Sequence, residues 1–396
     1  MSASQQVQRS ELPPAQPAYI LRGHKAQIHA LHFLRRNSRL LSGDAEGIII
    51  LWDLAIKRPK GVWRGHNGGI IGFGVWNDDR IVSHGRDGKL NVWQLGTEDE
   101  HMLSKDLPIE ESTKGNWKQP WILHSLPVHT LNFCAFAMCQ VPNTKAILVA
   151  TPAATEGVTI VHELPTEKPM HIVPPAQTQK TGMVMALRIL FLNEALHVIV
   201  GYESGLTSVQ KLKPNTENMW ELVSFCTPHT QPILSLDFIS DAGLYFTSGA
   251  DAIVAMASLS PTKNNIPLRT NATKHSGQQG LTVRSDGRSF ATADWDGRMR
   301  VYSTKSLEEL AILKWHKEGC YAVAFADMTA DNEPQDLWLL AQHGTGKDDE
   351  KGWNIGDALR GKQVNTVRQQ RESKTRDTRW LAAGSKDGKV SLWNVF

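Results

Sequence analysis

Apolar and polar residues alternate in short runs along most of this chain, and small turn residues separate the runs. Residues 65–95 show the unit most clearly, because a Gly-His pair there precedes two alternating apolar runs, an Asp-Gly turn and a Trp. After Asp87-Gly88, residues 89–93 alternate with a period of two, as in a half-buried strand entered through a tight turn. Residues 81–84 are the expected partner strand, so the pattern predicts antiparallel pairs.

Four side chains of this unit carry complementary hydrogen-bonding groups: the His66 imidazole, the Ser83 hydroxyl, the Asp87 carboxylate and the Trp93 indole. Each can donate to or accept from the next, so we predict a buried structural tetrad that satisfies its own hydrogen bonds. A hydrolase triad uses three of these residue types. A serine beneath a strand corner faces no cleft, however, and we expect no catalysis from it.

The spacing of this unit recurs, which is typical of a repeat architecture with a period of about 40 to 50 residues. A turn residue precedes an apolar residue by four positions in seven places: Gly47, Gly88, Gly157, Gly205, Ala252, Gly297 and Gly388. A histidine precedes an apolar residue by eight or nine positions in six places: His24, His66, His124, His229, His275 and His316. We therefore predict seven units and give these histidines a structural role.

The unit resembles the WD-repeat family in three segments: Gly23-His24 to Trp52-Asp53, Gly65-His66 to Trp93, and Lys386-Asp387-Gly388 to Trp393. The resemblance implies an all-β fold over residues 18–396, a seven-bladed propeller of four-stranded blades around a channel. It also implies a His, Ser/Thr, Asp and Trp tetrad inside each blade.

Only the second blade keeps all four tetrad residues at the family positions. Glu46 stands at the Asp position of the first blade and Ala383 at the serine position of the last, and the sixth keeps His275, Thr292 and Asp296 with Tyr302 in place of Trp. A lost partner leaves a buried polar group unpaired at a cost of about 1–3 kcal/mol. We therefore expect faster amide exchange in residues 141–260 than in residues 60–95.

The two ends of the chain complement each other. The chain stops three residues past Trp393, which leaves the last blade without a fourth strand, and residues 18–22 precede the first Gly-His pair as an outer strand does. We predict that this N-terminal strand completes the last blade, which closes the ring and removes an exposed sheet edge. Residues 1–17 are rich in Ser, Gln and Pro, and we expect a disordered tail.

Two long links interrupt the repeats. We place residues 97–120 between the second and third blades and interpret them as a solvated loop. In the last blade, an insertion at about 344–379 separates two strand-like runs, 337–341 and 380–384. The second run stands four residues before the Asp387 turn, so we assign it as the second strand.

The later half of this insertion is the most basic segment of the chain. Its seven cations are Arg360, Lys362, Arg368, Arg371, Lys374, Arg376 and Arg379, against Glu372 and Asp377. Two interpretations stay open, a hydrophilic insert without consequence and a docking segment for an acidic partner surface, with Trp353 as a candidate aromatic anchor. No aromatic residue lies between Trp353 and Trp380 to stack on a base, so direct nucleic-acid binding is not expected.

Composition changes this picture little. The formal charge of +3 is too small for a dedicated nucleic-acid binder, and the four cysteines form neither a C-x-x-C pair nor a set at zinc spacing. The segment 343–347 has the composition of a phosphate loop, but Ala341 and Asp348 stand where Gly and Ser/Thr are required. We expect no cofactor, no metal, no enzyme activity and, without an apolar run long enough to span a bilayer, no membrane partner.

The first two blades and the closing segment LAAGSKDGKVSLWNVF are similar to the ASTRA-associated WD-repeat subunits of fungi, and to the animal G-protein β-subunit-like protein. This resemblance implies a nuclear scaffold, with the cytoplasm as a second location. It also implies partner subunits and links to chromatin remodelling and to the co-chaperones that mature phosphatidylinositol-3-kinase-related kinases. The alternatives are a histone-tail reader or a ubiquitin-ligase adaptor. A true G-protein β subunit would need an N-terminal heptad helix, which residues 1–17 cannot form.

Overall fold

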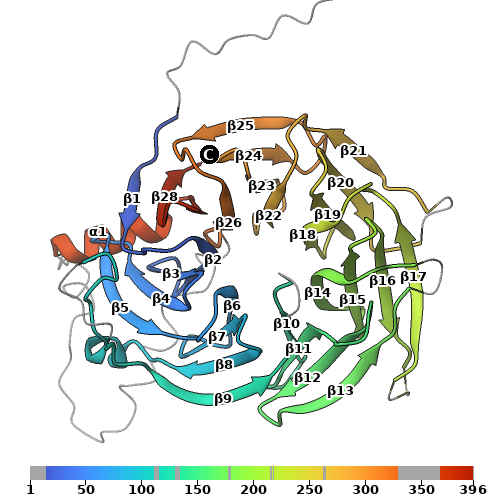
Figure 1. The fold of residues 1–396 in the computed structure, drawn as a ribbon, viewed down its shortest axis with the longest axis horizontal. Coiled ribbons are helices and arrows are strands. Elements are labelled where there is room, and N and C mark those ends of the chain that lie inside the picture. The colour runs from blue at the N-terminus through green and yellow to red at the C-terminus, as the bar shows by residue number, and fades with distance from the viewer. Residues whose placement is uncertain are drawn as a thin grey trace, which may run out of the picture.

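Seven four-stranded antiparallel sheets stand around a central channel, which confirms the predicted propeller (Figure 1). The computed structural model describes residues 15–110, 116–129, 134–176, 180–214, 216, 218–261, 265–328 and 366–395. Within these residues, no helix has both the length and the apolar character that a membrane crossing requires.

The strands of each blade are given from the channel outward. Blade 1 has β2 (Ile28–Leu34), β3 (Arg39–Asp44), β4 (Ile48–Asp53) and β5 (Arg58–Arg64), and blade 2 has β6 (Ile70–Val75), β7 (Arg80–Gly85), β8 (Lys89–Gln94) and β9 (Trp121–Pro127). Blade 3 has β10 (Ala137–Gln140), β11 (Ile147–Pro152), β12 (Thr159–Leu164) and β13 (Lys168–Val173). Blade 4 has β14 (Val184–Leu192), β15 (Ala195–Tyr202), β16 (Thr207–Leu212) and β17 (Trp220–Cys226). Blade 5 has β18 (Ile233–Ile239), β19 (Leu244–Gly249), β20 (Ile253–Ser258) and β21 (Arg269–Ala272). Blade 6 has β22 (Gln278–Val283), β23 (Ser289–Asp294), β24 (Arg298–Ser303) and β25 (Glu309–Lys314). Blade 7 has β26 (Cys320–Phe325), β27 (Trp380–Ser385), β28 (Lys389–Asn394) and β1 (Tyr19–Arg22).

The ring closes through the N-terminal strand, as predicted. β1 pairs with β28 in antiparallel register from Tyr19↔Leu392 to Arg22↔Lys389. Leu21 is buried in the apolar cluster that blade 7 shares with blade 1, together with Ile28 and Leu392. The edge of β28 is therefore covered by the other end of the chain. The tail prediction for residues 1–17 falls mostly on residues 1–14, which lie outside the described residues.

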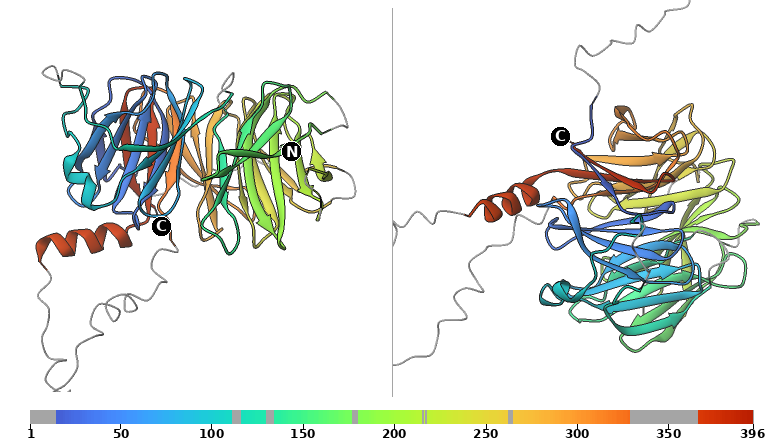
Figure 2. Two further views of the ribbon diagram at one scale, coloured as in Figure 1. Left: turned by 90° about the horizontal axis from the view of Figure 1, so that it is seen from below. Right: turned by 60° about the vertical axis from the view of Figure 1, so that its left-hand side comes forward.

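The disc has two faces that the links define. The tetrad face carries the links between second and third strands and the links between blades. The opposite face, which we call the α1 face, carries the links between first and second and between third and fourth strands. It takes its name from helix α1 (Val367–Asp377), which lies in the link from β26 to β27 (Figure 2).

The position predicted for the first long link is wrong. Residues 97–120 join β8 to β9 within blade 2, because β9 pairs with β8 from Lys89↔Pro127 to Gln94↔Trp121. The outer strand of this blade follows its long link, so the link does not separate two blades. In blade 7, β27 begins at Trp380, as assigned from the run 380–384, whereas the run 337–341 lies outside the described residues.

Candidate interaction surface

The four tetrad residues of the second blade form one hydrogen-bonded series. The His66 ring lies 2.9 Å from Asp87 through Nδ1 and 2.8 Å from the Ser83 hydroxyl through Nε2, and the Trp93 indole donates to Ser83 at 2.8 Å. Burial lowers the pKa of His66 although Asp87 opposes this shift, so the ring is neutral at pH 7. A neutral ring that donates to Asp87 accepts the Ser83 proton at Nε2. Ser83 is fully buried, and the series joins two strands without facing a substrate cleft.

The first blade also has a complete tetrad, and the interpretation of Glu46 as its altered member is wrong. Asp44, two residues earlier, lies 2.7 Å from Nδ1 of His24, whose Nε2 lies 2.7 Å from the Ser42 hydroxyl. The Trp52 indole donates to Ser42 at 2.8 Å. The Asp44 carboxylate at the end of β3 therefore reaches the histidine from another position in the chain.

In the last blade the missing hydroxyl comes from the neighbouring strand. Ala383 and Ser391 are directly opposed partners in the pairing of β27 with β28. The Ser391 hydroxyl lies 2.9 Å from Nε2 of His316 and accepts from the Trp393 indole at 2.9 Å. The series therefore survives the loss of serine at position 383.

Replacing Ser391 with alanine should lower the free energy of unfolding by about 1–3 kcal/mol, because two buried nitrogens then lose their partner. The double variant Ser391→Ala/Ala383→Ser places a hydroxyl on the opposed strand and should recover more than half of the loss. Urea unfolding followed by tryptophan fluorescence measures both. Equal stability of Ser391→Ala and the unmodified chain would contradict the proposed series.

Two of the six predicted tetrad histidines lie elsewhere. His124 sits on the outer strand β9 and pairs with Glu167 at 2.7 Å. The side chain of His275 is 38% exposed, and its Nδ1 lies 3.8 Å from Asp296. In blade 6 the fully buried Arg300 contacts Asp294 and donates to Asp296 at 2.7 Å. A guanidinium with two carboxylates has replaced the histidine, so the prediction that His275 completes this tetrad is wrong.

The basic end of the insertion forms helix α1, for which hydrophobic periodicity gave no prediction. Thr366 caps it: its hydroxyl accepts from the Gln369 amide at 3.3 Å, and its own amide donates to the Gln369 side chain at 2.7 Å. At the other end, the Trp380 indole donates to the carbonyl of the buried Thr375 at 3.0 Å. The helix is thus capped at its start and anchored to blade 7 near its end.

Helix α1 carries four of the seven predicted docking residues and presents them to solvent. Arg368, Arg371, Lys374 and Arg376 are all exposed, whereas Trp353, Arg360 and Lys362 lie outside the described residues. Arg368 pairs with Glu372 at 2.9 Å one turn away. Arg371, Lys374 and Arg376 remain as exposed cations on this helix, which protrudes from the disc beside blade 1 (Figure 2).

The link within blade 2 is not a fully solvated loop. Its short 3₁₀ helix η1 (Glu98–Met102) places Glu100, which is almost completely buried, against blade 1. Glu100 contacts Arg35, accepts from Nη2 of Arg39 at 3.0 Å, and lies 3.6 Å from the Lys60 ammonium. One buried carboxylate thus holds three cations, and the link joins blade 2 to blade 1.

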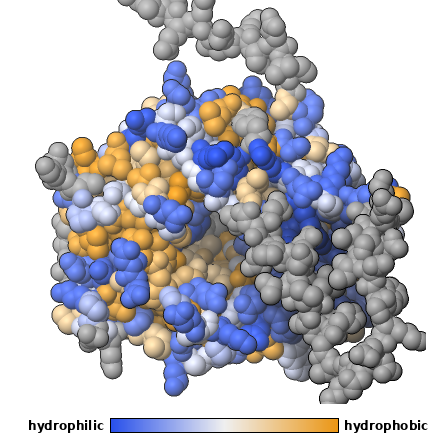
Figure 3. Space-filling model, turned by 180° about the vertical axis from the view of Figure 1, so that it is seen from behind, coloured by the Kyte–Doolittle hydropathy of each residue, from blue (hydrophilic) through white to orange (hydrophobic). Residues whose placement is uncertain are grey.

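The two halves of the α1 face differ in character. Figure 3 shows that apolar surface gathers on the half of this face away from α1, whereas the surface that stays visible on the other half is largely polar. One exposed apolar side chain of blade 4 on this face is Met219, in the link from β16 to β17. A partner that covers this whole face would need an apolar and an acidic part.

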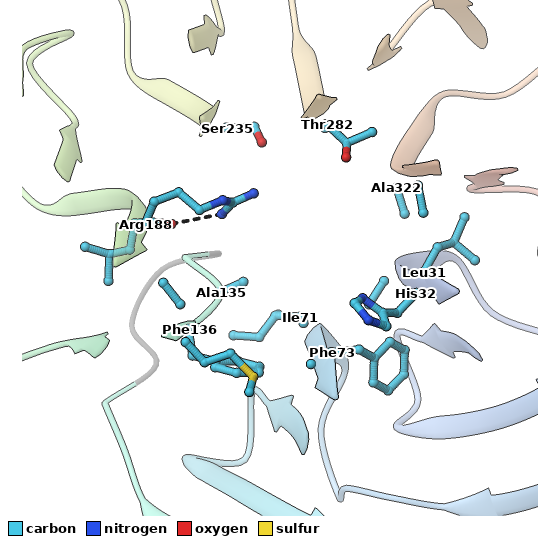
Figure 4. A pocket seen from close by; sticks show the side chains of 18 of the residues that line it. Leu31, His32, Ile71, Phe73, Ala135, Phe136, Arg188, Ser235, Thr282 and Ala322 are labelled. Carbon is cyan, nitrogen blue, oxygen red and sulfur yellow. Dashed lines mark hydrogen bonds between the residues drawn. The ribbon is translucent and has the colours of Figure 1, made fainter. Parts of the chain in front are cut away.

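A cavity of about 720 Å³ occupies the central channel, and its walls come from the inner strands (Figure 4). As predicted, these strands contribute mostly apolar or small residues, among them Leu31, Ile71, Phe136 and Ala322. Arg188 of β14 points into the space (Figure 4). Among the described residues, no three His, Cys, Asp or Glu side chains are grouped as a metal site would need.

Comparisons with known proteins agree with this geometry. Residues 15–53 and 360–394 match the family model described as WD domain, G-beta repeat. Relatives from several fungi carry the name ASTRA-associated protein 1. The relative from Verticillium alfalfae is 45% identical, covering 96% of this chain and 93% of the relative, and that from Aspergillus niger is 40% identical over 97% and 98%. The relative from Schizosaccharomyces pombe is 31% identical over 78% and 93%.

Proposed function

This chain belongs to the ASTRA-associated protein 1 family of WD-repeat propellers, and on that premise we propose that it is a non-catalytic subunit that holds other proteins together in a nuclear assembly. The relatives' name supports membership of a multiprotein complex. The proposal includes the narrower roles that the sequence resemblance implies, in chromatin remodelling and in the co-chaperone maturation of phosphatidylinositol-3-kinase-related kinases.

The observation that carries this proposal is the contrast between a closed disc and an exposed, charged appendage. The tetrads of blades 1, 2 and 7 bury their hydroxyls and imidazoles in structural hydrogen bonds. Helix α1, in contrast, buries little of its surface except at Thr375. A helix that is polar all round adds little packing to its own domain, which suits contact with a second protein.

The charge of α1 indicates an acidic partner surface. Arg371, Lys374 and Arg376 are exposed cations within eleven residues, and the helix carries no acidic residue in its first turn. Exposed charges at the rim of an interface mainly set the association rate and its dependence on salt. We therefore infer that α1 steers and docks an acidic surface of another subunit.

Affinity purification of the tagged full-length chain from nuclei tests this function. With Arg371→Glu, Lys374→Glu and Arg376→Glu together, recovery of a direct partner should fall roughly tenfold, because three exposed pairs are worth about 1–3 kcal/mol in total. The matched control Arg371→Lys/Arg376→Lys keeps the charge and should recover the partner normally.

The identities and amounts of the recovered proteins decide between the candidate functions. Unchanged recovery after charge reversal would remove the docking role of α1. Recovery of histones alone or of ubiquitin-ligase subunits would instead favour the reader or adaptor function.

A further inference from the structure

Arg188 lies at the middle of the channel, far from either mouth. It is the central residue of β14, four residues from Val184 at the tetrad face and four from Leu192 at the α1 face. At about 3.3 Å per residue, the backbone of Arg188 lies roughly 13 Å from each end of its strand. Figure 4 shows it pointing into the cavity, with His32, Ser235 and Thr282 around the same space.

The guanidinium is held in position by the wall behind it. Its Nε donates to Asp237 of β18 at 3.0 Å, and its Nη1 donates to the Leu187 carbonyl at 2.9 Å. Asp237 is fixed in turn by the Val283 amide of blade 6, which donates to it at 2.8 Å. Within the described part of the chain Nη2 makes no hydrogen bond, and the side chain is 30% exposed to the channel. One edge of this pre-organised guanidinium thus has no hydrogen-bond partner among the described residues.

Arg188 is paired with Asp237, and the two histidines of the channel wall add no charge at neutral pH. Burial lowers the pKa of His32 to about 4, and burial together with Arg86 lowers the pKa of His29. Both imidazoles are therefore uncharged at pH 7. Asp327 lines the cavity just beyond the end of β26, at the α1 face. Among the described lining residues of the cavity, none at the tetrad face is acidic.

We propose that Arg188 receives the terminal carboxylate of a partner protein whose apolar C-terminal segment enters the channel from the tetrad face. A guanidinium edge matches a carboxylate with two parallel donors. Apolar side chains in the wall, such as Leu31, Ile71 and Ala322, can contact aliphatic side chains of the inserted segment. A free phosphate would lose hydration there with a single arginine to replace it. An acidic side chain from a segment lying across the mouth is too short to reach this depth.

That the bound segment belongs to a partner protein rests on the scaffold function proposed above. Binding of a carboxylate to Arg188 can be tested on the purified chain alone. Met138 and Met185 line the same cavity, so ¹³C-methyl methionine NMR of the full-length protein reports on its filling. Hexanoate is the probe, hexanamide is its uncharged control, and inorganic phosphate represents a free anion.

Hexanoate should shift the Met138 signal saturably. Hexanamide should bind at least roughly tenfold more weakly, because it lacks the negative charge that strengthens hydrogen bonds from the guanidinium. Arg188→Gln should lose this difference, and Arg188→Lys should keep part of it. Equal binding of hexanoate and hexanamide to the unmodified chain, or phosphate binding as tight as hexanoate, would overturn the proposal, whatever the stability of the variants.

A peptide pair tests the chain-end requirement. The peptide Gly-Ser-Gly-Leu-Ala-Leu with a free carboxylate should shift Met138, and the same peptide with a C-terminal amide should not. An amidated peptide with Glu in place of the serine carries one negative charge away from its C-terminus. If it bound as tightly as the free acid, the proposal that a chain end inserts into the channel would be refuted. Failure here leaves the α1 charge-reversal result intact, so the two proposals fail separately.

Discussion

Removal of residues 1–23 is expected to lower the free energy of unfolding by about 5 kcal/mol or more, whereas removal of residues 1–15 should leave it nearly unchanged. The longer deletion removes β1, and with it all four pairs to β28. It also removes Leu21 from the apolar cluster, and the loss of one buried leucine side chain alone costs about 2–5 kcal/mol. Urea unfolding followed by circular dichroism measures both truncations.

The shorter deletion is a close control, because it keeps Ala18, whose amide donates to the Leu392 carbonyl at 2.7 Å. Leu21→Ala tests the packing contribution alone and should fall between the two truncations. The uncovered edge of β28 should also promote association between molecules, which light scattering detects. Identical unfolding curves for the two truncations would show that ring closure contributes nothing to stability.

Ring closure was predictable because the order of strands along the chain leaves the last blade one strand short. Turn residues four positions before an apolar residue mark the third strand of each blade, and the run 18–22 has no other partner once the last blade lacks a strand. Such short-range signals are read directly from sequence. The link 97–120 was misplaced because nothing in the sequence tells whether an outer strand precedes or follows a long link.

The tetrads show what fixed sequence spacing cannot predict. Asp44 and Ser391 supply the same chemical groups as the expected positions 46 and 383, but from other places on the strands. A position rule detects a residue type at a fixed offset, whereas a hydrogen bond depends only on where the atom lies in space. The pairing of Ala383 with Ser391 becomes visible only once the strand register is known.

The candidate sites were predictable to different degrees. Thr366 and Gln369 form a capping box, a sequence signal that would have indicated the start of α1. The helix lacks an apolar stripe, so hydrophobic periodicity could not reveal the rest of it. The channel site was not predictable, because Arg188, Asp237 and Val283 come from three blades and are distant in the chain.

Arg300→Met is expected to lower the free energy of unfolding by about 3–5 kcal/mol at pH 7. The side chains of Arg300 and Asp294 are both fully buried and in contact, and Arg300 also contacts Asp296 and lies 3.5 Å from Glu309. Removing one partner of a buried ion pair leaves the other charge without compensation, which produces a loss of this size. Thermal unfolding over a range of pH values measures the effect.

The pH dependence of this loss identifies Asp294 as its source. Burial raises the pKa of Asp294 to about 6 even with Arg300 beside it, and loss of the guanidinium should raise this pKa further. The folded state then binds a proton more tightly than the unfolded state, where the carboxyl titrates near about 4. Protonation therefore stabilises the folded variant as the pH falls, and its deficit should shrink between pH 7 and pH 5.

The double variant Arg300→Met/Asp294→Asn separates the unpaired charge from the lost packing. It removes both charges at the centre of the cluster, and replacing a whole buried pair by uncharged side chains is often close to neutral. We expect it to recover at least half of the single variant's loss at pH 7 and to lose most of the pH dependence between pH 5 and 7. If the double variant were as unstable as Arg300→Met at every pH, the guanidinium would stabilise blade 6 through packing, and its carboxylate partner would be incidental.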